Sequence, residues 1–238
     1  MRPLKFHPIL KQTLWGGERI IPYKELASGL SRVGESWELS GMPGSESVVA
    51  EGPWAGSTLS ELIGRFGAEL LGKANYARFG QEFPLLVKFI DAREDLSIQV
   101  HPDDELARKR HGKSGKCEMW YVLEAEPGAS LLTGFSRPIA PAEYERRVAD
   151  NTLTDVLNRQ AIASGDVFYL PAGRVHSIGK GSFIVEIQQS SDITYRIYDF
   201  DRRDAAGNSR ELHTELAREA IDFESSENSR ITYAPENN

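Results

Sequence analysis

The chain has 238 residues, 40% of them hydrophobic, which is enough for a sizeable core, and it carries a formal net charge of -7. An acidic chain lacks the clustered Lys and Arg that a nucleic-acid backbone requires, so we expect neither DNA nor RNA as a partner. The single cysteine, Cys117, excludes an intrachain disulfide and fits a reducing compartment, so we expect a cytoplasmic protein. No uncharged apolar run reaches about 18 residues, which predicts no membrane span. One domain over residues 1–238 is the simplest organisation.

Short extended segments separated by turn residues dominate the chain. So many short strands favour an antiparallel sandwich or barrel over a parallel sheet, and we expect a mainly β fold with a few short flanking helices. The predicted strands cover, in chain order, residues 36–39, 47–50, 85–90, 96–101, 118–124, 130–133, 166–170, 183–188 and 194–198.

Helices are predicted between and after these strands. Thr58, followed three places later by Glu61, forms a capping box, and apolar residues at helical spacing continue from there to Leu71. Residues 102–110 place acids first and bases last, matching the helix dipole, before Gly112 ends the helix. Short helices are expected at 141–148, at 152–157 and at 216–221, and a polar tail from about residue 224 is expected to fray.

Two segments carry metal-capable side chains. In the strand over 96–101, Gln99 and His101 point to one face while Ile98 and Val100 point to the other. In 165–176, alternating apolar residues run into a turn at Pro171 and Gly173, and this turn holds His176 at a fixed place. Three candidate ligands are therefore Gln99, His101 and His176.

A third segment supplies a carboxylate. Residues 116–123 indicate a strand with Glu118 at its start, and Cys117 should face away from the ligand side as a packed thiol. A set of Gln, His, Glu and His suits zinc or another first-row divalent ion with one position open for substrate. The alternatives are that His101 and His176 are hydrogen-bonded histidines without a metal, and that Glu118 is an exposed strand residue.

The second of these segments also matches a family motif. Gly165, five residues, Pro171, one residue, Gly173, two residues and His176 fit the spacing of a cupin motif. The first cupin motif departs from the usual pattern, since Gln99 stands in place of its first histidine and sixteen residues separate His101 from Glu118.

With these departures from the usual pattern, the chain resembles type I mannose-6-phosphate isomerase in its short bacterial form. The resemblance runs through most of the chain. It is carried by residues 15–17, 34–40, 96–102, 116–118, 171–176, 186–189 and 194–199. It implies a cupin-type antiparallel β-barrel, or jelly roll. From the resemblance we expect this chain to lack the helical insert and the further β domain that longer members of the family carry.

The resemblance also implies roles for individual residues. One divalent metal ion, usually zinc, would be bound by Gln99, His101, Glu118 and His176. Family active-site positions match Lys88, Lys116, Asp192 and Arg196, and a pocket-lining position matches Trp15. From these matches we expect Arg196, Lys116 and Asp192 to be catalytic, and Lys88 and Trp15 to bind substrate.

The residues themselves leave some of these roles open. Arg196 lies inside an otherwise apolar strand, where a charge has either a function or a structural ion pair with Asp192 or Glu186. Lys116 shares the face of Glu118, with surface solvation as its alternative. Lys88 is conspicuous in the apolar run 86–90, although an outward-facing lysine would be solvated, and Trp15 could be a core aromatic.

The activity that the resemblance implies is the interconversion of mannose 6-phosphate and fructose 6-phosphate through a cis-enediol. Such a site must stabilise charge on two adjacent oxygens, which a divalent cation and the Arg196 guanidinium can do. Lys88 and Lys116 are candidates for holding phosphate or moving protons. A phosphorylated hexose is thus the expected partner, and the sequence gives no oligomeric state. The alternatives are a metal-cupin dioxygenase, a sugar epimerase and a catalytically silent sugar-binding module.

Overall fold

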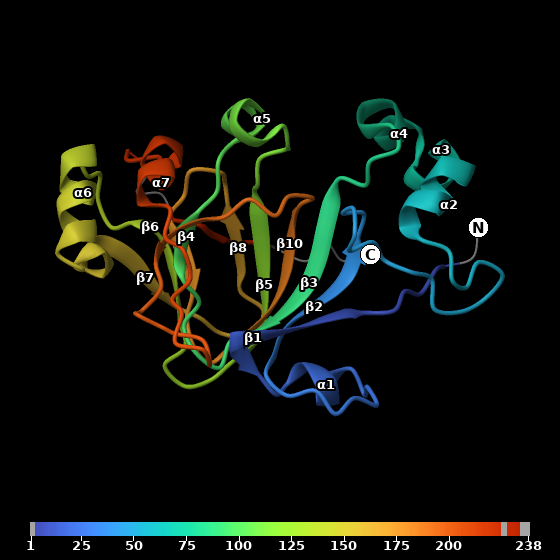
Figure 1. Ribbon diagram of the computed structural model, residues 1–238, viewed down its shortest axis with the longest axis horizontal. Helices are drawn as coiled ribbons and strands as arrows, with labels where there is room; N and C mark the ends of the chain where they lie inside the picture. The colour runs from blue at the N-terminus through green and yellow to red at the C-terminus, as the bar shows by residue number, and fades with distance from the viewer. Residues whose placement is uncertain (1–2, 225–227, 234–238) are drawn as a thin grey trace.

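The computed structural model describes residues 3–224 and 228–233, and in them two antiparallel sheets face each other (Figure 1). The larger sheet has the order β1 (Ile9–Gly17), β2 (Val33–Ser40), β3 (Leu85–Asp91), β10 (Ser182–Gln189), β5 (Glu118–Ala125), β8 (Val167–Leu170) and β12 (Arg230–Ile231). The smaller sheet has the order β11 (Tyr195–Tyr198), β4 (Ile98–Val100), β9 (His176–Ile178), β6 (Ser130–Phe135) and β7 (Leu157–Ala161).

The mainly β, antiparallel fold class predicted from the sequence is confirmed, with one correction. The two sheets form a sandwich and do not close into a barrel, because no hydrogen-bonded ladder among the described residues joins an edge strand of one sheet to the other sheet.

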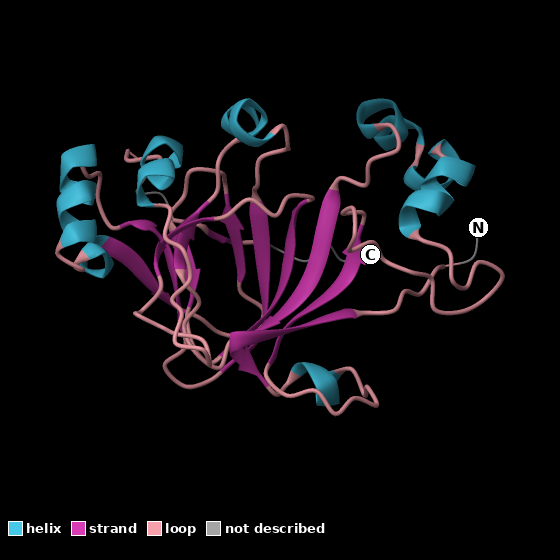
Figure 2. Ribbon diagram, in the orientation of Figure 1, coloured by secondary structure: helices cyan, strands magenta, loops and turns pink. Residues whose placement is uncertain are grey.

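Short helices lie around the edges of this sandwich (Figure 2). They are α1 (Ile20–Tyr23), α2 (Leu59–Phe66), α3 (Ala68–Leu71), α4 (Lys73–Phe79), α5 (Asp104–His111), α6 (Pro141–Ala149) and α7 (Thr214–Ala220), with a 3₁₀ turn at Leu153–Val156. Helices α6 and α7 lie together at one end, and α2, α3 and α4 lie at the other (Figure 1). Within the described residues, no helix is both long and apolar enough to cross a membrane.

Several predicted elements differ in detail from the structure. The capping box of Thr58 and Glu61 forms as predicted, but the helix it opens breaks at Gly67, whose φ of 47° ends α2 before α3 begins. Residues 47–50 make isolated bridges and no strand. Strands β1, β7, β9 and β12 were not predicted, because they are short or carry polar residues that hide the alternation of a strand.

The helical segment expected around 141–158 corresponds to α6 and the 3₁₀ turn, after which the chain enters β7. The tail expected from about residue 224 lies partly outside the described residues, since 225–227 and 234–238 are not described. A single domain over the whole chain stays a prediction.

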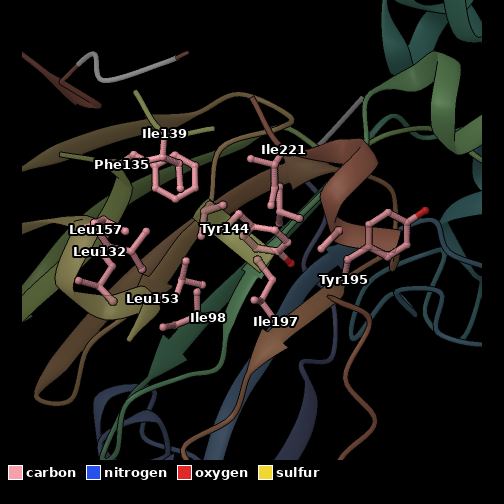
Figure 3. Close-up of a cluster of buried hydrophobic side chains, with 14 of the residues drawn as sticks. Ile98, Leu132, Phe135, Ile139, Tyr144, Leu153, Leu157, Tyr195, Ile197 and Ile221 are labelled. Carbon is pink, nitrogen blue, oxygen red and sulfur yellow. The ribbon is translucent and has the colours of Figure 1, made fainter. Parts of the chain in front are cut away.

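Two apolar clusters occupy the two sides of the smaller sheet. The first packs Ile98 and Ile197 of this sheet against α6 and α7, with Tyr144 at its centre (Figure 3). The second lies between the sheets and includes Trp120 and Ile184 from the larger one. Because side chains alternate along a strand, every second residue of β4, β9 and β11 points away from the first cluster and toward the larger sheet.

Backbone hydrogen bonds fasten together the segments that carry the candidate ligands. Gln99 of β4 pairs with His176 of β9. The amide of Gly173 donates to the carbonyl of His101 at 2.9 Å, and the amide of Lys116 donates to the carbonyl of Pro102 at 3.1 Å. The starts of β5 and β9 are therefore both tied to the chain that leaves β4, which fixes their side chains relative to one another.

Gly173 offers a test of this arrangement. Its φ is +85°, and an added Cβ would lie 3.1 Å from the carbonyl oxygen of Ala220. Gly173→Ala should lower the free energy of unfolding by about 1–2 kcal/mol from the left-handed backbone alone, and by about 1–3 kcal/mol more from the crowded contact. Gly207→Ala is the matched control, because Gly207 has the same φ of +85° with nothing within 4 Å of the added Cβ.

Chemical denaturation of both variants measures the difference. The backbone arrangement described here requires that the alanine at 173 be the more destabilising of the two, and equal losses would contradict it.

Candidate metal centre

Three buried side chains from three segments converge between the sheets. His101 follows β4, Glu118 begins β5 and His176 begins β9, and their exposed fractions are 2%, 1% and 1%. His101 Nε2 lies 3.2 Å from Glu118 Oε1, and His176 Nε2 lies 3.5 Å from Glu118 Oε2. The potential ligand atoms of the three residues all lie within 4.8 Å of one another. The structure thus brings three of the four predicted ligands to one point.

Backbone carbonyls fix the orientation of both imidazole rings. Nδ1 of His101 lies 2.9 Å from the carbonyl oxygen of Ile193, and Nδ1 of His176 lies 2.8 Å from that of Arg174. A carbonyl can only accept, so each Nδ1 carries the proton, and a neutral ring then presents the lone pair of Nε2 to Glu118. Metal-binding histidines are commonly oriented in this way, by a hydrogen bond from the ring nitrogen that does not bind the metal.

The charge states of these groups follow from their surroundings. Burial, helped by the positive charge of Lys116, lowers the pKa of His101 to about 3, and burial also lowers the pKa of His176. Burial alone would raise the pKa of Glu118, but the Lys116 ammonium and the histidines outweigh it and leave that pKa below its ordinary value. Near neutral pH the cluster is therefore two neutral imidazoles and one carboxylate.

The donor set fits a metal cation. Of the described residues, none forms a hydrogen bond with His101 Nε2 or with either oxygen of Glu118, although Lys116 Nζ lies 2.8 Å from Oε1 as an ion pair. Buried acceptors without a donor are costly, and a divalent ion among them would remove that cost. Two imidazole nitrogens and a carboxylate are ligands that zinc accepts.

Gln99 lies beside the three converging side chains. Its Nε2 is 3.3 Å from Nε2 of His176, its partner across the β4/β9 pair. Rotation of the amide by 180° would exchange nitrogen for oxygen and turn Oε1 toward the cluster. Cys117 lies outside the cluster, as predicted from the sequence, and its sulfur accepts from the amide of Ala172 at 3.4 Å, although the residue is half-buried rather than fully packed.

Both lysines singled out by the sequence are buried, so neither is a solvated surface residue. Lys116 has an exposed fraction of 5% and contacts Glu118. Lys88 has an exposed fraction of 7%, and its Nζ lies 2.8 Å from Glu186 Oε1 and 3.8 Å from Glu35 Oε2. Burial lowers the pKa of Lys88, but these two carboxylates outweigh it and leave that pKa above its ordinary value, so Lys88 is a fixed cation.

Arg196 lies next to this cluster but has neither of the ion pairs considered for it. It pairs with Gln99 across β11 and β4, which places both on the face that looks toward the larger sheet. Its Nη1 donates to the carbonyl of Glu211 at 2.9 Å, and its Nε is buried without a partner among the described residues. Glu186 pairs instead with Lys88, and Asp192 pairs with Lys113 at 2.9 Å.

Asp192 and Trp15, the two remaining predicted site residues, differ in their exposure to solvent. Asp192 is about half exposed, and it immediately precedes Ile193, the residue whose carbonyl orients His101. The Lys113 ammonium lowers the pKa of Asp192 below its ordinary value, so this carboxylate is ionised. Trp15 is buried in the apolar cluster between the sheets. Their catalytic and substrate-binding roles stay predictions.

Sequence reasoning missed a group of charges that adjoins Arg196. Asp199 accepts hydrogen bonds from Arg202 Nη2 at 2.6 Å and from Arg210 Nε at 2.7 Å. Burial, together with the charges of Arg210 and Arg202, lowers the pKa of Arg196 from its ordinary value, although Asp199 and Glu211 act in the opposite direction. Three arginines beside these two carboxylates leave a surplus of positive charge. The pattern of arginines from 196 to 210 was a signal that could have indicated it.

The buried histidines make the metal-free protein sensitive to acid. A histidine that stays neutral when folded binds fewer protons than it does in the unfolded chain, so the free energy of unfolding falls as pH drops below the unfolded pKa near 6.5. For His101, with a folded pKa of about 3, the loss should be about 1.4 kcal/mol per pH unit below pH 6.5.

The measurement is denaturation of chelator-treated protein between pH 7 and pH 5. His101→Gln should reduce the slope of the free energy of unfolding against pH by the contribution of about one proton. His7→Gln, which alters an exposed histidine, should leave this slope as in the unaltered chain. A His101→Gln protein with the full pH dependence would show that His101 is not held neutral.

Comparisons with known proteins identify the family of this chain. The family described as phosphomannose isomerase type I, catalytic domain, matches residues 4–135. Among curated proteins, the Bacillus subtilis mannose-6-phosphate isomerase ManA is 39% identical over 224 residues, which cover 94% of this chain and 69% of that protein. The Streptococcus mutans mannose-6-phosphate isomerase is 38% identical over 221 residues, which cover 92% of this chain and 67% of that protein.

A solved structure agrees with the sequence relatives. The crystal structure of the mannose 6-phosphate isomerase from Bacillus subtilis superimposes with a TM-score of 0.86 and 35% identity, covering 93% of this chain and 69% of that one. With a family match over more than half of its residues, relatives near 39% identity and this structural likeness, the chain belongs to the phosphomannose isomerase type I family.

Proposed function

We propose that this protein interconverts mannose 6-phosphate and fructose 6-phosphate. The observation that carries the proposal is the convergence of His101, Glu118 and His176 on one buried point, in a chain whose relatives are named for this reaction. Aldose–ketose isomerisation moves a proton between C1 and C2 and develops negative charge on the adjacent oxygens. A buried site rich in fixed positive groups suits that chemistry.

We assign one divalent metal ion to the site, with zinc as the expected ion. Its ligands would be His101 Nε2, Glu118, His176 Nε2 and the side-chain oxygen of Gln99, the weakest donor of the four. Bound there, the ion would supply Lewis-acid polarisation of the sugar oxygens.

The surrounding side chains would act on the substrate directly. Arg196 has an unpaired Nε on the face that looks toward the cluster, and we assign it to stabilise the charge that develops on the enediol oxygens. Lys116, held beside Glu118, would move or hold a proton at a substrate oxygen. Lys88 and Trp15 would bind the sugar. Asp192 would be a base at the edge of the site, since it is ionised and partly exposed.

Phosphate binding needs cations that are not already neutralised. Lys88 and Lys116 each contact a buried carboxylate, whereas Arg202 and Arg210 both bind the one carboxylate of Asp199. We therefore assign the substrate phosphate to Arg202 and Arg210 rather than to the lysines, because guanidinium groups match the geometry of phosphate oxygens.

Two expectations about the protein's surroundings remain part of this proposal. A phosphorylated sugar of central metabolism and a chain with one cysteine both fit a cytoplasmic location. The net charge of -7 argues against a nucleic-acid partner.

A coupled assay that follows fructose 6-phosphate from mannose 6-phosphate tests the function. The unaltered protein should bind about one metal ion and turn over substrate without consuming oxygen. Removal of the metal should abolish turnover, and adding zinc should restore it. Oxygen uptake would favour a dioxygenase, and a substrate-induced rise in melting temperature without product would indicate a silent binding protein.

Arg196→Ala separates catalysis from metal binding. We expect it to reduce kcat by about a hundredfold or more, in the range found for removal of a charge-stabilising donor, while the metal content stays near one ion per chain. Metal analysis and steady-state kinetics on the same preparation check this. Retained turnover would remove Arg196 from the mechanism.

Arg210→Gln tests the phosphate assignment. It removes one of the surplus charges, so KM for mannose 6-phosphate should rise by about tenfold, as expected for one charge-assisted hydrogen bond. Arg203→Gln is the matched control, since Arg203 is exposed and its Nη1 donates only to the carbonyl of Gly207. Equal KM values for the two variants would contradict the assignment.

A further inference from the structure

A row of five side chains crosses the inner face of the larger sheet beside the metal cluster. Trp37 of β2 pairs with Lys88 of β3, Lys88 pairs with Glu186 of β10, and Glu186 pairs with Trp120 of β5. Glu35 lies two residues before Trp37 on β2 and therefore points to the same face. This row contains two carboxylates, one ammonium and two indoles.

Each carboxylate of the row is held by an indole N–H. Trp37 Nε1 donates to Glu35 Oε2 at 2.6 Å, and Trp120 Nε1 donates to Glu186 Oε2 at 2.8 Å. An indole can only donate, so each bond favours the ionised carboxylate and restrains its rotation. The Lys88 ammonium lies between the two carboxylates, 2.8 Å from Glu186 and 3.8 Å from Glu35.

Sequence patterns assigned Glu35 and Trp37 no role in the site, and Lys88 would be well paired by Glu186 alone. A second carboxylate, whose side chain is 20% exposed, adds a desolvation cost that an apolar residue would avoid. What Glu35 adds is a restraint on the opposite side of the ammonium. A four-carbon side chain held from two sides keeps its charge at one place, with a donor left for a bound molecule.

We propose that Glu35, oriented by Trp37, is a positioning residue that holds the Lys88 ammonium where it contacts the sugar. The inference rests on the proposed function, in which Lys88 binds substrate. Glu35 acts through Lys88 and does not touch the substrate or the metal.

The test is a double-mutant cycle on the metal-loaded enzyme. Glu35→Gln keeps the shape of the side chain and an oxygen for the Trp37 N–H but removes the charge. We expect KM for mannose 6-phosphate to rise by about tenfold, with kcat changed less than KM and with metal content unchanged. In a Lys88→Met background the same substitution should have no further effect on KM, because there is no ammonium left to position.

Glu38→Gln is the matched control on the same strand. Glu38 pairs with Lys24 and hydrogen-bonds Ser36, and it takes no part in the site, so its loss should leave KM unchanged. Trp37→Phe is the second variant, since it keeps every charge and an aromatic ring while it removes the N–H with the five-membered ring, and it should raise KM in the same direction as Glu35→Gln. This second variant keeps the test decisive if Lys88→Met fails to fold.

Three results would overturn the inference: an unchanged KM in Glu35→Gln, an unchanged KM in Trp37→Phe, or full additivity of Glu35→Gln with Lys88→Met. These failures differ from failure of the proposed function. Were the function wrong, the unaltered enzyme would not produce fructose 6-phosphate at all, and no cycle could be measured.

Discussion

The site depends on buried hydrogen-bond acceptors that face one another in the interior of the fold. The carbonyl oxygens of Ile193 and Arg174 accept hydrogen bonds from the Nδ1–H groups of two buried histidines. These bonds turn the Nε2 lone pairs of both rings toward an ionised Glu118. Acceptors facing acceptors in a space closed to water are unfavourable. The Lys116 ammonium offsets part of this cost at Glu118, and a divalent cation bound among the three side chains would offset more of it.

The metal cluster and one of the apolar clusters both lie between the two sheets. On its other face the smaller sheet buries Ile98 and Ile197 under α6 and α7, and the alternate residues of its strands face the larger sheet. The inner face of the larger sheet carries a charged region, with Lys88, Glu186 and Glu118, and an apolar region around Trp120. Backbone bonds from Gly173 and Lys116 then fix the ligand-bearing segments at the boundary between the two regions.

Alternation and spacing in the sequence predicted much of this arrangement. The shared face of Gln99 and His101, the orientation of Cys117 away from the ligands and the helix that ends at Gly112 follow from local rules. The break at Gly67 and the short strand that begins at His176 do not, because a positive φ and a three-residue strand depend on contacts with distant segments. The partners of Lys88 and Arg196 were also beyond local rules. Sequence periodicity predicts on which face of a strand a side chain lies. The partner of that side chain on the next strand depends on the register between the two strands.

Crystals grown with zinc, with diffraction recorded above and below the zinc absorption edge, test the central claim most directly. The account predicts one anomalous peak per chain, bounded by His101 Nε2, a Glu118 oxygen and His176 Nε2, with the side-chain oxygen of Gln99 turned toward it. A peak at any other place, or a zinc-saturated protein in which these three side chains bind no ion, would contradict it.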